Sequence, residues 1–383
     1  MPHKRPRTVH DLIKKKLKFN RVLALQGARQ TGKSFLAREI LSKELQKSFY
    51  VSLDSKSERE FAERSPQTFL TKLSEHCPVM IDEAQKAPSI FDEIKLQVDV
   101  NTAPGQYILL GSTEFSREVL VKESLTGRLG RIRIFPMSFR EALGTKHAKP
   151  SRTAFLKHLD HGGMPGITFV RDATERKSLV QDWLNTLCFR DLLQFKKLKL
   201  DGELALEIFE QVSVLENPTL AAISKATHTS ARRVESHLKA LEQLFAIYRL
   251  HAHSSMRSSK PIFLPLDSSI VTYFSGSFSR KAQVSLLNER LCLSHYSGDP
   301  HAKFFYYHSR SKRMIHLLEE QKNKKIAFQI LEYEDFSGVD LELMRVFLAQ
   351  HEGYQGTVFA PITRQEKIHS IKLKPWEALL VLD

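Results

Sequence analysis

The chain has 383 residues, 42% of them hydrophobic, a length that allows two or three domains with a core in each. It has no stretch of roughly 18 apolar residues and no apolar segment after its basic N-terminus, so we expect neither a membrane span nor a secretory signal. Three widely spaced cysteines without a CxxC pair argue against disulfides and a zinc site and favour a cytoplasmic protein, while a formal charge of +15 favours acidic partners.

The N-terminal segment is strongly basic. Its first 21 residues hold eight basic side chains and one acid. Leu12, Ile13 and Leu17 have helical spacing, so we expect a short amphipathic helix with a basic face. Two interpretations stay open: a helix that covers an edge of the core with solvated charges, or an electrostatic footprint for nucleic acid or another polyanion.

A phosphate-binding pattern follows the first apolar run, Val22–Leu25. Its residues are Gly27, Ala28, Arg29, Gln30, Thr31, Gly32, Lys33 and Ser34. The next segment, Phe35–Leu41, has helical spacing, so the pattern lies between a strand and a helix, where backbone N–H groups can surround phosphates. Lys33 is expected to reach the β and γ phosphates, and the Ser34 hydroxyl to bind Mg²⁺. The alternative is a glycine turn that closes an ordinary βα unit.

A second buried strand, Pro78–Ile81, leads into two carboxylates, Asp82 and Glu83. Parallel sheets bind ligands at the carboxyl ends of their strands, so we expect both acids beside the phosphate-binding loop. Asp82 would hold Mg²⁺ through water, and Glu83 would accept a proton from the attacking water as a general base. Alone, such a run is more typical of a strand that enters a solvated turn. Together with the upstream loop it indicates catalysis.

Polar and basic residues follow the next strand, Tyr107–Leu110. Ser112 is expected to contact the γ-phosphate or the attacking water, or else to be a polar strand exit. Arg128 lies between two glycines and is the candidate for stabilising the charge of phosphoryl transfer, in its own subunit or a neighbour's. A surface position is the alternative for Arg128. Arg131 and Arg133 alternate with isoleucines, as on a half-buried strand.

Several further segments, taken in chain order, match one family. They are Met80–Pro88, Ile94–Asp99, Leu110–Thr113, Ser124–Arg128, Phe135–Glu141 and Gly162–Pro165. With the Gly27–Ser34 loop, they resemble a large prokaryotic family of AAA-type ATPases that carry an N-terminal ATPase core and a C-terminal domain of uncharacterised function. The resemblance is dense to about residue 200 and thin beyond it. It implies ATP rather than GTP as the nucleotide, and it names no substrate.

The middle of the chain has helical spacing, first around Trp183–Phe195 and then in three short helices. The three are Ala205–Val212, Leu220–Ala226 with Pro218 as its cap, and one that Ser230 opens. A β-hairpin of Ala246–Leu250 and Ile262–Leu264 is expected after them. Three helices and a hairpin are typical of a winged helix-turn-helix, with the third helix as a reader of the DNA major groove. Its outward residues are Arg232, Arg233, Ser236 and Lys239. A module that only binds protein is the alternative.

The last hundred residues faintly resemble the family's C-terminal region, which has a restriction-endonuclease-like fold. Where that fold keeps a metal-binding Asp and a Glu-x-Lys pair, this chain has His316, Gln329 and Leu331. Mg²⁺ ions cannot be held without clustered carboxylates, so we expect a nuclease-like scaffold that no longer cuts. The alternative is a site rebuilt in another register from nearby acids, which are Glu289, Glu319, Glu320, Glu332 and Glu334.

These patterns predict an α/β fold: a parallel P-loop NTPase sheet of AAA type with helices on both faces, a winged helix-turn-helix, and a small α+β nuclease-like domain. The expected boundaries are 1–145 for the ATPase core, 146–202 for a helical lid or linker, 203–275 for the winged helix and 276–383 for the nuclease-like domain.

The predicted function is Mg²⁺-dependent ATP binding and hydrolysis that drives a switch acting on DNA or a protein partner. Lys33, Glu83 and Arg128 are the expected catalytic residues. One alternative is a nucleotide-sensing DNA-binding regulator without significant hydrolysis, and another is a nuclease fuelled by ATP. A non-hydrolysing sensor would need no general base such as Glu83.

Overall fold

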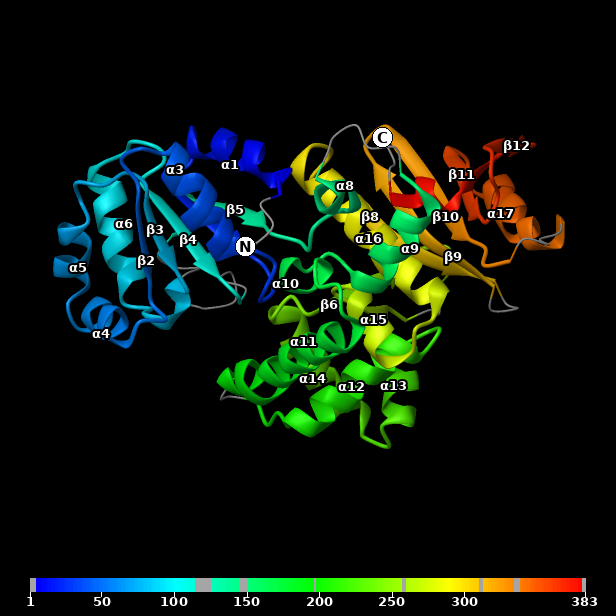
Figure 1. Ribbon diagram of the computed structural model, residues 1–383, viewed down its shortest axis with the longest axis horizontal. Coiled ribbons are helices and arrows are strands. Elements are labelled where there is room, and N and C mark those ends of the chain that lie inside the picture. Colours follow the sequence, from blue (N-terminus) through cyan, green and yellow to red (C-terminus); the bar gives the residue numbers. More distant parts are fainter. Residues whose placement is uncertain are drawn as a thin grey trace. The chain divides into compact units, whose positions relative to one another are not determined.

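A computed structural model of the chain describes residues 5–113, 125–144, 150–195, 198–256, 260–309, 313–333 and 338–380. Ser124 and Glu334, which the sequence patterns include, lie outside these residues. Contacts divide the chain into two compact units (Figure 1). The N-terminal unit comprises Arg7–Phe135 with Gln243–Phe245, and the C-terminal unit comprises Met1–Pro6, Pro136–Glu242 and Ala246–Asp383. Within the described residues, no helix is both long and apolar enough to cross a membrane.

A five-stranded sheet organises the N-terminal unit. Its strands are β1 (Val22–Gln26), β2 (Phe49–Ser52), β3 (Val79–Asp82), β4 (Tyr107–Gly111) and β5 (Leu129–Arg133). Every pair is parallel and the order is β2-β3-β4-β1-β5. The parallel sheet of a P-loop NTPase, predicted from three of these strands, is confirmed. Since all strands run the same way, their carboxyl ends share one edge.

Both faces of this sheet are covered, because buried residues follow one another along β1. Val22 and Ala24 pack in one core cluster with the helices α4 (Lys56–Arg64), α5 (Pro66–Lys72) and α6 (Ile90–Val100), while Leu23 and Leu25 are buried on the opposite face. The predicted basic helix is confirmed as α1 (Val9–Leu17), which contacts β1 and buries Val9 and Ile13, while Leu12 and Leu17 are partly buried.

The C-terminal unit begins with short helices. They are α8 (Phe139–Leu143), α9 (Arg152–His161), α10 (Pro165–Thr168) and α11 (Ala173–Thr186), the last continued by a π-turn, Leu187–Asp191, and a 3₁₀ turn, Leu192–Gln194. The Gly162–Pro165 motif connects α9 to α10. Gly162 has a φ of +69°, and a Cβ on Gly163 would lie 2.1 Å from the Met137 carbonyl oxygen. Both glycines are therefore required by backbone geometry.

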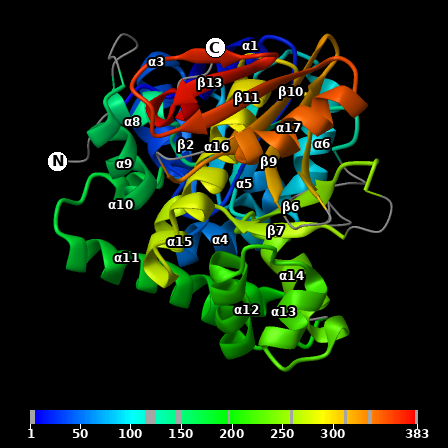
Figure 2. The same ribbon diagram turned by 90° about the vertical axis from the view of Figure 1, so that its right-hand side faces the viewer.

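Three helices and a hairpin follow, as predicted. The helices are α12 (Gly202–Val214), α13 (Leu220–Ala226) and α14 (Ala231–Gln243), which gather beneath the hairpin of β6 (Ile247–Ala252) and β7 (Ile262–Pro265) (Figure 2). The predicted cap of α13 is wrong. Thr219, rather than Pro218, caps it by accepting a hydrogen bond from the Ala222 N–H at 3.2 Å, which a proline side chain cannot do.

An eight-stranded sheet completes the unit, in the order β12-β13-β11-β10-β9-β8-β6-β7. The remaining strands are β8 (Lys303–His308), β9 (Met314–Gln321), β10 (Lys324–Ile330), β11 (Tyr354–Ala360), β12 (Glu366–Ile368) and β13 (Ile371–Pro375). The helices are α15 (Ser268–Phe274), α16 (Phe278–Tyr296), α17 (Gly338–Gln350) and a 3₁₀ turn, Trp376–Leu380. The hairpin belongs to this sheet, since β6 pairs with β8 in parallel.

Candidate functional site

The glycine loop leaves the carboxyl end of β1 and turns sharply into a helical segment. A Cβ on Gly27 would lie 2.2 Å from the Ile134 carbonyl oxygen, so no other residue fits there. Gly32 has a φ of +92°, which places it in the left-handed region that favours glycine. The loop is also held from outside, because the buried Arg7 donates hydrogen bonds of 2.8 Å to the carbonyls of Thr31 and Phe135.

Lys33 is buried in this loop and is 6% exposed. Its Nζ donates hydrogen bonds of 2.8 Å to the carbonyl oxygens of Gly27 and Ala28. Burial lowers the pKa of Lys33 to about 8, while Glu83 and Asp82 act in the opposite direction. A cation held mainly by neutral carbonyls gains strongly from an anion placed in the loop, which is the property that a phosphate site needs.

The helix after the loop is less regular than expected. It comprises α2 (Lys33–Phe35), a π-helical segment (Leu36–Leu41) and α3 (Ser42–Glu44). The predicted helix over Phe35–Leu41 is confirmed as helical, but its turns are wider than α-helical ones. Such π-turns are frequent beside functional sites. Nothing in the sequence pattern explains this one.

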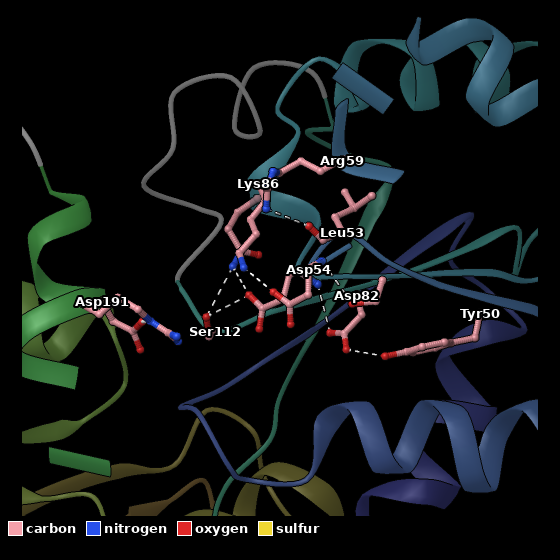
Figure 3. Close-up of polar contacts among 12 residues, drawn as sticks. Tyr50, Leu53, Asp54, Arg59, Asp82, Lys86, Ser112 and Asp191 are labelled. Carbon is pink, nitrogen blue, oxygen red and sulfur yellow. Dashed lines mark hydrogen bonds and ion pairs between the residues drawn. The ribbon is translucent and has the colours of Figure 1, made fainter. Parts of the chain in front are cut away.

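Asp82 lies at the carboxyl end of β3 and is 3% exposed. Its Oδ1 accepts a hydrogen bond of 3.0 Å from the Glu83 N–H, and its Oδ2 accepts one of 2.6 Å from the Tyr50 hydroxyl. Figure 3 shows Tyr50 pointing toward Asp82. The same hydroxyl also interacts with Ser34. Burial, followed by the contact with Asp82, raises the pKa of Tyr50, so its hydroxyl stays a hydrogen-bond donor.

This arrangement fits Mg²⁺. Tyr50 lies against both Ser34 and Asp82, so a hydroxyl and a carboxylate oxygen approach one point. No cluster of three or more His, Cys, Asp or Glu side chains that could hold a metal occurs within the described residues. A site with one carboxylate and one hydroxyl suits Mg²⁺, which keeps several waters and takes further oxygens from phosphates.

Glu83 directly follows β3 in a left-handed conformation, with a φ of +53°. Such a conformation is uncommon for a residue other than glycine, and it tends to persist where the surroundings hold it. Its carboxylate accepts hydrogen bonds from the Gln85 amide and, at 3.2 Å, from the Ser112 hydroxyl. The structure therefore brings Glu83 and Ser112 together at the carboxyl edge of the sheet, and Figure 3 shows Ser112 there.

Arg128 lies elsewhere. It directly precedes β5, and its carbonyl oxygen accepts a hydrogen bond from the N–H of Val22, the first residue of β1. Its position is thus at the amino edge of the sheet, whereas the glycine loop follows the last residue of β1. Its guanidinium donates two hydrogen bonds to the Asp99 carboxylate, one of them 2.8 Å long. The structure does not bring Arg128 to the phosphate-binding loop of its own chain.

Sequence reasoning missed three residues of this site: Arg7, Tyr50 and Gln85. Each acts through a contact with a residue far away in the sequence or through a turn whose shape the sequence does not announce. Tyr50 reads as an ordinary β2 residue, and only the pairing of β2 with β3 brings it to Asp82. Gln85 lies two residues after Glu83, so its proximity could have been noticed.

If the site hydrolyses ATP with Mg²⁺, Tyr50→Phe should raise the Mg²⁺ concentration needed for half-maximal turnover by roughly tenfold, the usual cost of losing a partner that orients a metal ligand. The hydroxyl fixes one oxygen of Asp82, and its loss leaves that carboxylate free to rotate. The measurement is ATP turnover against Mg²⁺ concentration. The matched control is Tyr107→Phe on β4 of the same sheet, which loses a hydroxyl that donates to Gln97 on α6. An unchanged Mg²⁺ requirement in Tyr50→Phe would show that the contact has no role.

The C-terminal candidates are placed as follows. Arg232, Arg233 and Lys239 are exposed on α14, where Arg233 contacts Asp201 at 3.5 Å and Lys239 contacts Glu235 at 2.8 Å. Ser236 is only partly exposed. Two of the three cations are thus already paired with carboxylates, and Arg232 is the exception among them in the described part of the chain.

Three of the acids near the nuclease-like motif, Glu289, Glu319 and Glu320, have structural partners. Glu289 accepts a hydrogen bond from the Phe139 N–H at the start of α8, and burial raises the pKa of Glu289 to about 8. Glu319 is buried against Arg290 at 2.6 Å, and Glu320 accepts a hydrogen bond of 2.7 Å from the Tyr354 hydroxyl. His316, Gln329 and Leu331 do lie together, around a cavity that also involves Glu332.

Comparison with known proteins gives two family matches. Residues 19–143 match the model of an AAA domain, and residues 152–280 match that of a domain of unknown function (DUF8612). An uncharacterized protein of Methanocaldococcus jannaschii is 22% identical over 280 residues, which cover 66% of this chain and 61% of that protein. An uncharacterized protein of Mycobacterium tuberculosis is 27% identical over 173 residues, 45% of this chain and 36% of that protein. The matched region thus covers less than two thirds of either relative.

A solved structure supports the fold. The Walker-type ATPase of Pyrococcus abyssi covers 71% of this chain, and 99% of its own length is covered, with a TM-score of 0.50 and 16% sequence identity. The likeness is to its fold. Together with the AAA domain match, it supports a P-loop architecture around the glycine loop described above.

Proposed function

We propose, from the prokaryotic AAA-type P-loop ATPase domain that residues 19–143 form and the domain of unknown function that follows it, that this protein binds and hydrolyses ATP with Mg²⁺ and uses the nucleotide state as a switch. The observation that carries the proposal is the convergence of Lys33, Asp82 and Glu83 at one edge of the sheet. A sheet edge that offers a cation, a metal-binding carboxylate and a base has the parts that phosphoryl transfer to water requires.

Each residue has a distinct task in this proposal. The N–H groups of the glycine loop and the Lys33 ammonium bind the phosphates, after Lys33 gives up its bonds to the Gly27 and Ala28 carbonyls. Ser34 and Asp82 would hold Mg²⁺, which when bound neutralises charge that develops on the phosphates. Glu83 accepts a proton from the attacking water, and Ser112 and Gln85 orient the Glu83 carboxylate.

The direct test is to measure nucleotide binding and turnover by the purified chain. We expect Mg²⁺-dependent binding of ATP and slow intrinsic hydrolysis, because Arg128, the arginine expected to stabilise phosphoryl transfer, lies at the amino edge of the sheet and is bonded to Asp99. Removal of Mg²⁺ with a chelator should stop turnover. Failure to bind any adenine or guanine nucleotide would refute the proposal. Preferential binding of GTP would refute only the choice of ATP as the nucleotide.

Arg128 keeps a narrower role in this proposal. Because it lies at the amino edge of its own sheet, it could stabilise phosphoryl transfer only at the site of another copy of the chain. Its two hydrogen bonds to Asp99 would then have to open or rearrange. A neighbour's arginine would also make turnover depend on protein concentration, which separates this role from a purely structural ion pair.

The second candidate is a DNA-binding regulator that senses nucleotide without hydrolysing it. The exposed Arg232 on α14 and the basic surface of α1 favour contact with DNA. In this scheme the three helices and hairpin act as a winged helix-turn-helix in the proposed domain 203–275, between the proposed helical region 146–202 and the proposed nuclease-like domain 276–383. The environment of Glu83 argues against a pure sensor. Two hydrogen-bond donors orient the Glu83 carboxylate, and a protein that does not hydrolyse ATP needs no such oriented base.

If DNA is bound, its affinity should fall steeply with salt, and the Arg232→Glu, Arg233→Glu double variant should lower the slope of log K against log salt by about one per lost phosphate contact. Most of the effect is expected from Arg232, since Arg233 already contacts Asp201. Fluorescence anisotropy with a labelled duplex measures both quantities. Arg345→Glu on α17 is a control of equal charge change per site. Absence of binding at low salt would leave α14 as a solvated basic surface.

We expect no nicking of supercoiled plasmid with Mg²⁺ or Mn²⁺ and ATP. Glu319 and Glu320 are occupied by Arg290 and Tyr354, and the motif positions carry neutral side chains. Agarose electrophoresis of the plasmid checks this. Nicking that persists in Lys33→Ala but disappears in Glu332→Ala would show that an acidic site has been rebuilt near the cavity.

A further inference from the structure

A cavity of about 270 Å³ lies within the C-terminal unit, apart from the glycine loop. The start of α16, β9, the end of β10 and the connection before α13 surround it. The polar side chains of the lining that could contact a ligand include Asn217, Arg280, Gln283, His316, Gln329 and Glu332. Its volume is at the lower end of the range of small-molecule sites, so a ligand with few heavy atoms would fit.

The deepest charge of this cavity is Arg280, which is 3% exposed. Its guanidinium donates to the Gln283 Oε1 at 2.8 Å and to the carbonyls of Val212 and Phe263 at 2.7 and 3.3 Å. All of these partners are neutral, and the Nε has no hydrogen-bond partner in the described structure. A buried cation normally has an anionic partner, because burial without one is costly. Burial accordingly lowers the pKa of Arg280 to about 9.

The polar lining next to Arg280 is held in one orientation. The His316 Nδ1 accepts a hydrogen bond of 3.2 Å from the Ile330 N–H, so its proton is on Nε2, which faces the Ser279 hydroxyl at 3.2 Å. Burial and the nearby Arg280 lower the pKa of His316 to about 4, so the ring is neutral. Gln283 donates to the His316 carbonyl at 3.0 Å, which fixes its Oε1 toward Arg280.

The cavity also contains two hydrogen-bond acceptors to which no donor is bonded in the described structure. The Oε1 of Gln329 and the Oδ1 of Asn217 are both buried and have no hydrogen-bond partner in the described structure. At the mouth, the carboxylates of Glu216 and Glu332 are exposed and make no ion pair within the described part of the chain, while the exposed Arg313 donates to the Val339 carbonyl. A group with N–H donors would satisfy these oxygens, and a positive charge on that group would suit the mouth.

We propose that this cavity binds a small zwitterionic molecule, with its carboxylate or phosphate group on Arg280 and its amino group toward Gln329, Asn217 and the acidic mouth. The site is separate from the ATPase site and does not depend on the proposed hydrolysis. Carboxylate and phosphate are equivalent partners for a guanidinium, so amino acids and aminoalkyl phosphates are the two sources of this chemistry.

The test uses matched pairs of probes that differ by one amino group. L-glutamate is compared with glutarate, and 2-aminoethyl phosphate with ethyl phosphate, by isothermal titration and by thermal shift of the full chain. All measurements use the Lys33→Ala variant, so that the glycine loop does not bind the phosphate probes. We expect at least one amine-bearing probe to bind saturably, and its amine-free partner to bind at least roughly tenfold more weakly, since a lost buried hydrogen bond to a charged group costs about that much.

Gln283→Glu provides the variant that should still fold. It has the shape of glutamine and brings a carboxylate oxygen to the Arg280 Nη1, so the internal anion replaces the ligand's, at the cost of the one hydrogen bond that the Gln283 amide donates to the His316 carbonyl. Affinity for the bound probe should fall at least roughly tenfold, with an unchanged circular dichroism spectrum. Arg280→Met tests the same contact but also removes the hydrogen bonds that Arg280 donates to two carbonyls. Arg345→Gln on α17 is the surface control.

The possible outcomes separate clearly. Binding of an amine-bearing probe that Gln283→Glu weakens supports the proposal, and the pair that responds identifies the anionic group. Equal binding of both members of each pair would overturn it, because the acceptors then play no part. No saturable binding at millimolar concentration by either pair would overturn it as well. None of these results depends on whether the chain hydrolyses ATP.

Discussion

Glu83→Gln should retain ATP and lose turnover by roughly 100- to 10,000-fold, the usual contribution of a general base. The amide keeps the shape of the side chain, so the contact with Ser112 can persist, but it cannot accept a proton from water. Lys33→Ala should instead abolish detectable nucleotide binding, because it removes the buried cation that the loop carbonyls hold. Fluorescence titration with a labelled nucleotide and a phosphate-release assay measure the two properties independently.

Lys86→Ala is the control for this pair of variants. Lys86 is in the same segment as Glu83 but forms an ion pair with Asp54 (Figure 3). Its loss should change turnover little, since partly exposed ion pairs contribute at most about 1 kcal/mol. Equal loss of binding in both Lys33→Ala and Glu83→Gln would contradict separate roles. Full turnover in Glu83→Gln would exclude Glu83 as the base.

Glu319→Gln should destabilise the C-terminal unit by about 3 kcal/mol, because removing one partner of a buried ion pair leaves the other charge without compensation. The Arg290 Nε lies 2.6 Å from the Glu319 Oε2, and the two side chains are 3% and 1% exposed. Arg290 also lies over the Phe328 ring, 5.6 Å from its centroid, so the cation has no path to water. Urea denaturation followed by circular dichroism measures the shift of the transition.

Asp160→Asn is the matched control, since Lys281 and Asp160 have the same 2.6 Å contact but Asp160 is half exposed. We expect a loss of at most about 1 kcal/mol from this pair. The two pairs share α16, so they differ mainly in burial. Equal effects of the two substitutions would mean that burial does not control the strength of the Arg290–Glu319 pair.

The carboxyl edge of the sheet illustrates how far the pattern of residues reaches. Each apolar run that precedes a glycine or an acid can be recognised from neighbouring residues alone. Because parallel strands end at one edge of the sheet, these runs place Ser34, Asp82, Glu83 and Ser112 together without any coordinates. The contact between Glu83 and Ser112 bears out that reasoning. This reasoning did not identify Tyr50, because the role of Tyr50 depends on which strand lies beside β3. Strand order is decided by long-range packing.

Arg128 shows the opposite case. Its flanking glycines and the resemblance suggested a residue near phosphates, but the register of β5 against β1 puts it at the amino edge. Register is determined by cross-strand pairing rather than by neighbours in the sequence. The hairpin of β6 and β7 is similar: its two strands are evident from local pattern, yet its parallel pairing with β8 joins residues more than fifty positions apart.

The sequence by itself determined the glycine loop and three strands of the parallel sheet around it, because each depends on short-range spacing and on glycine's freedom at positions such as Gly32. It did not indicate β2, α4 or α5. Only the tertiary structure decided the partner of Arg128, the contact of Tyr50 with Asp82, and the enclosure of Arg280 among neutral groups. These contacts depend on which distant segments pack together. Burial between those segments then determines the strength of the electrostatic interactions and the pKa of each enclosed group.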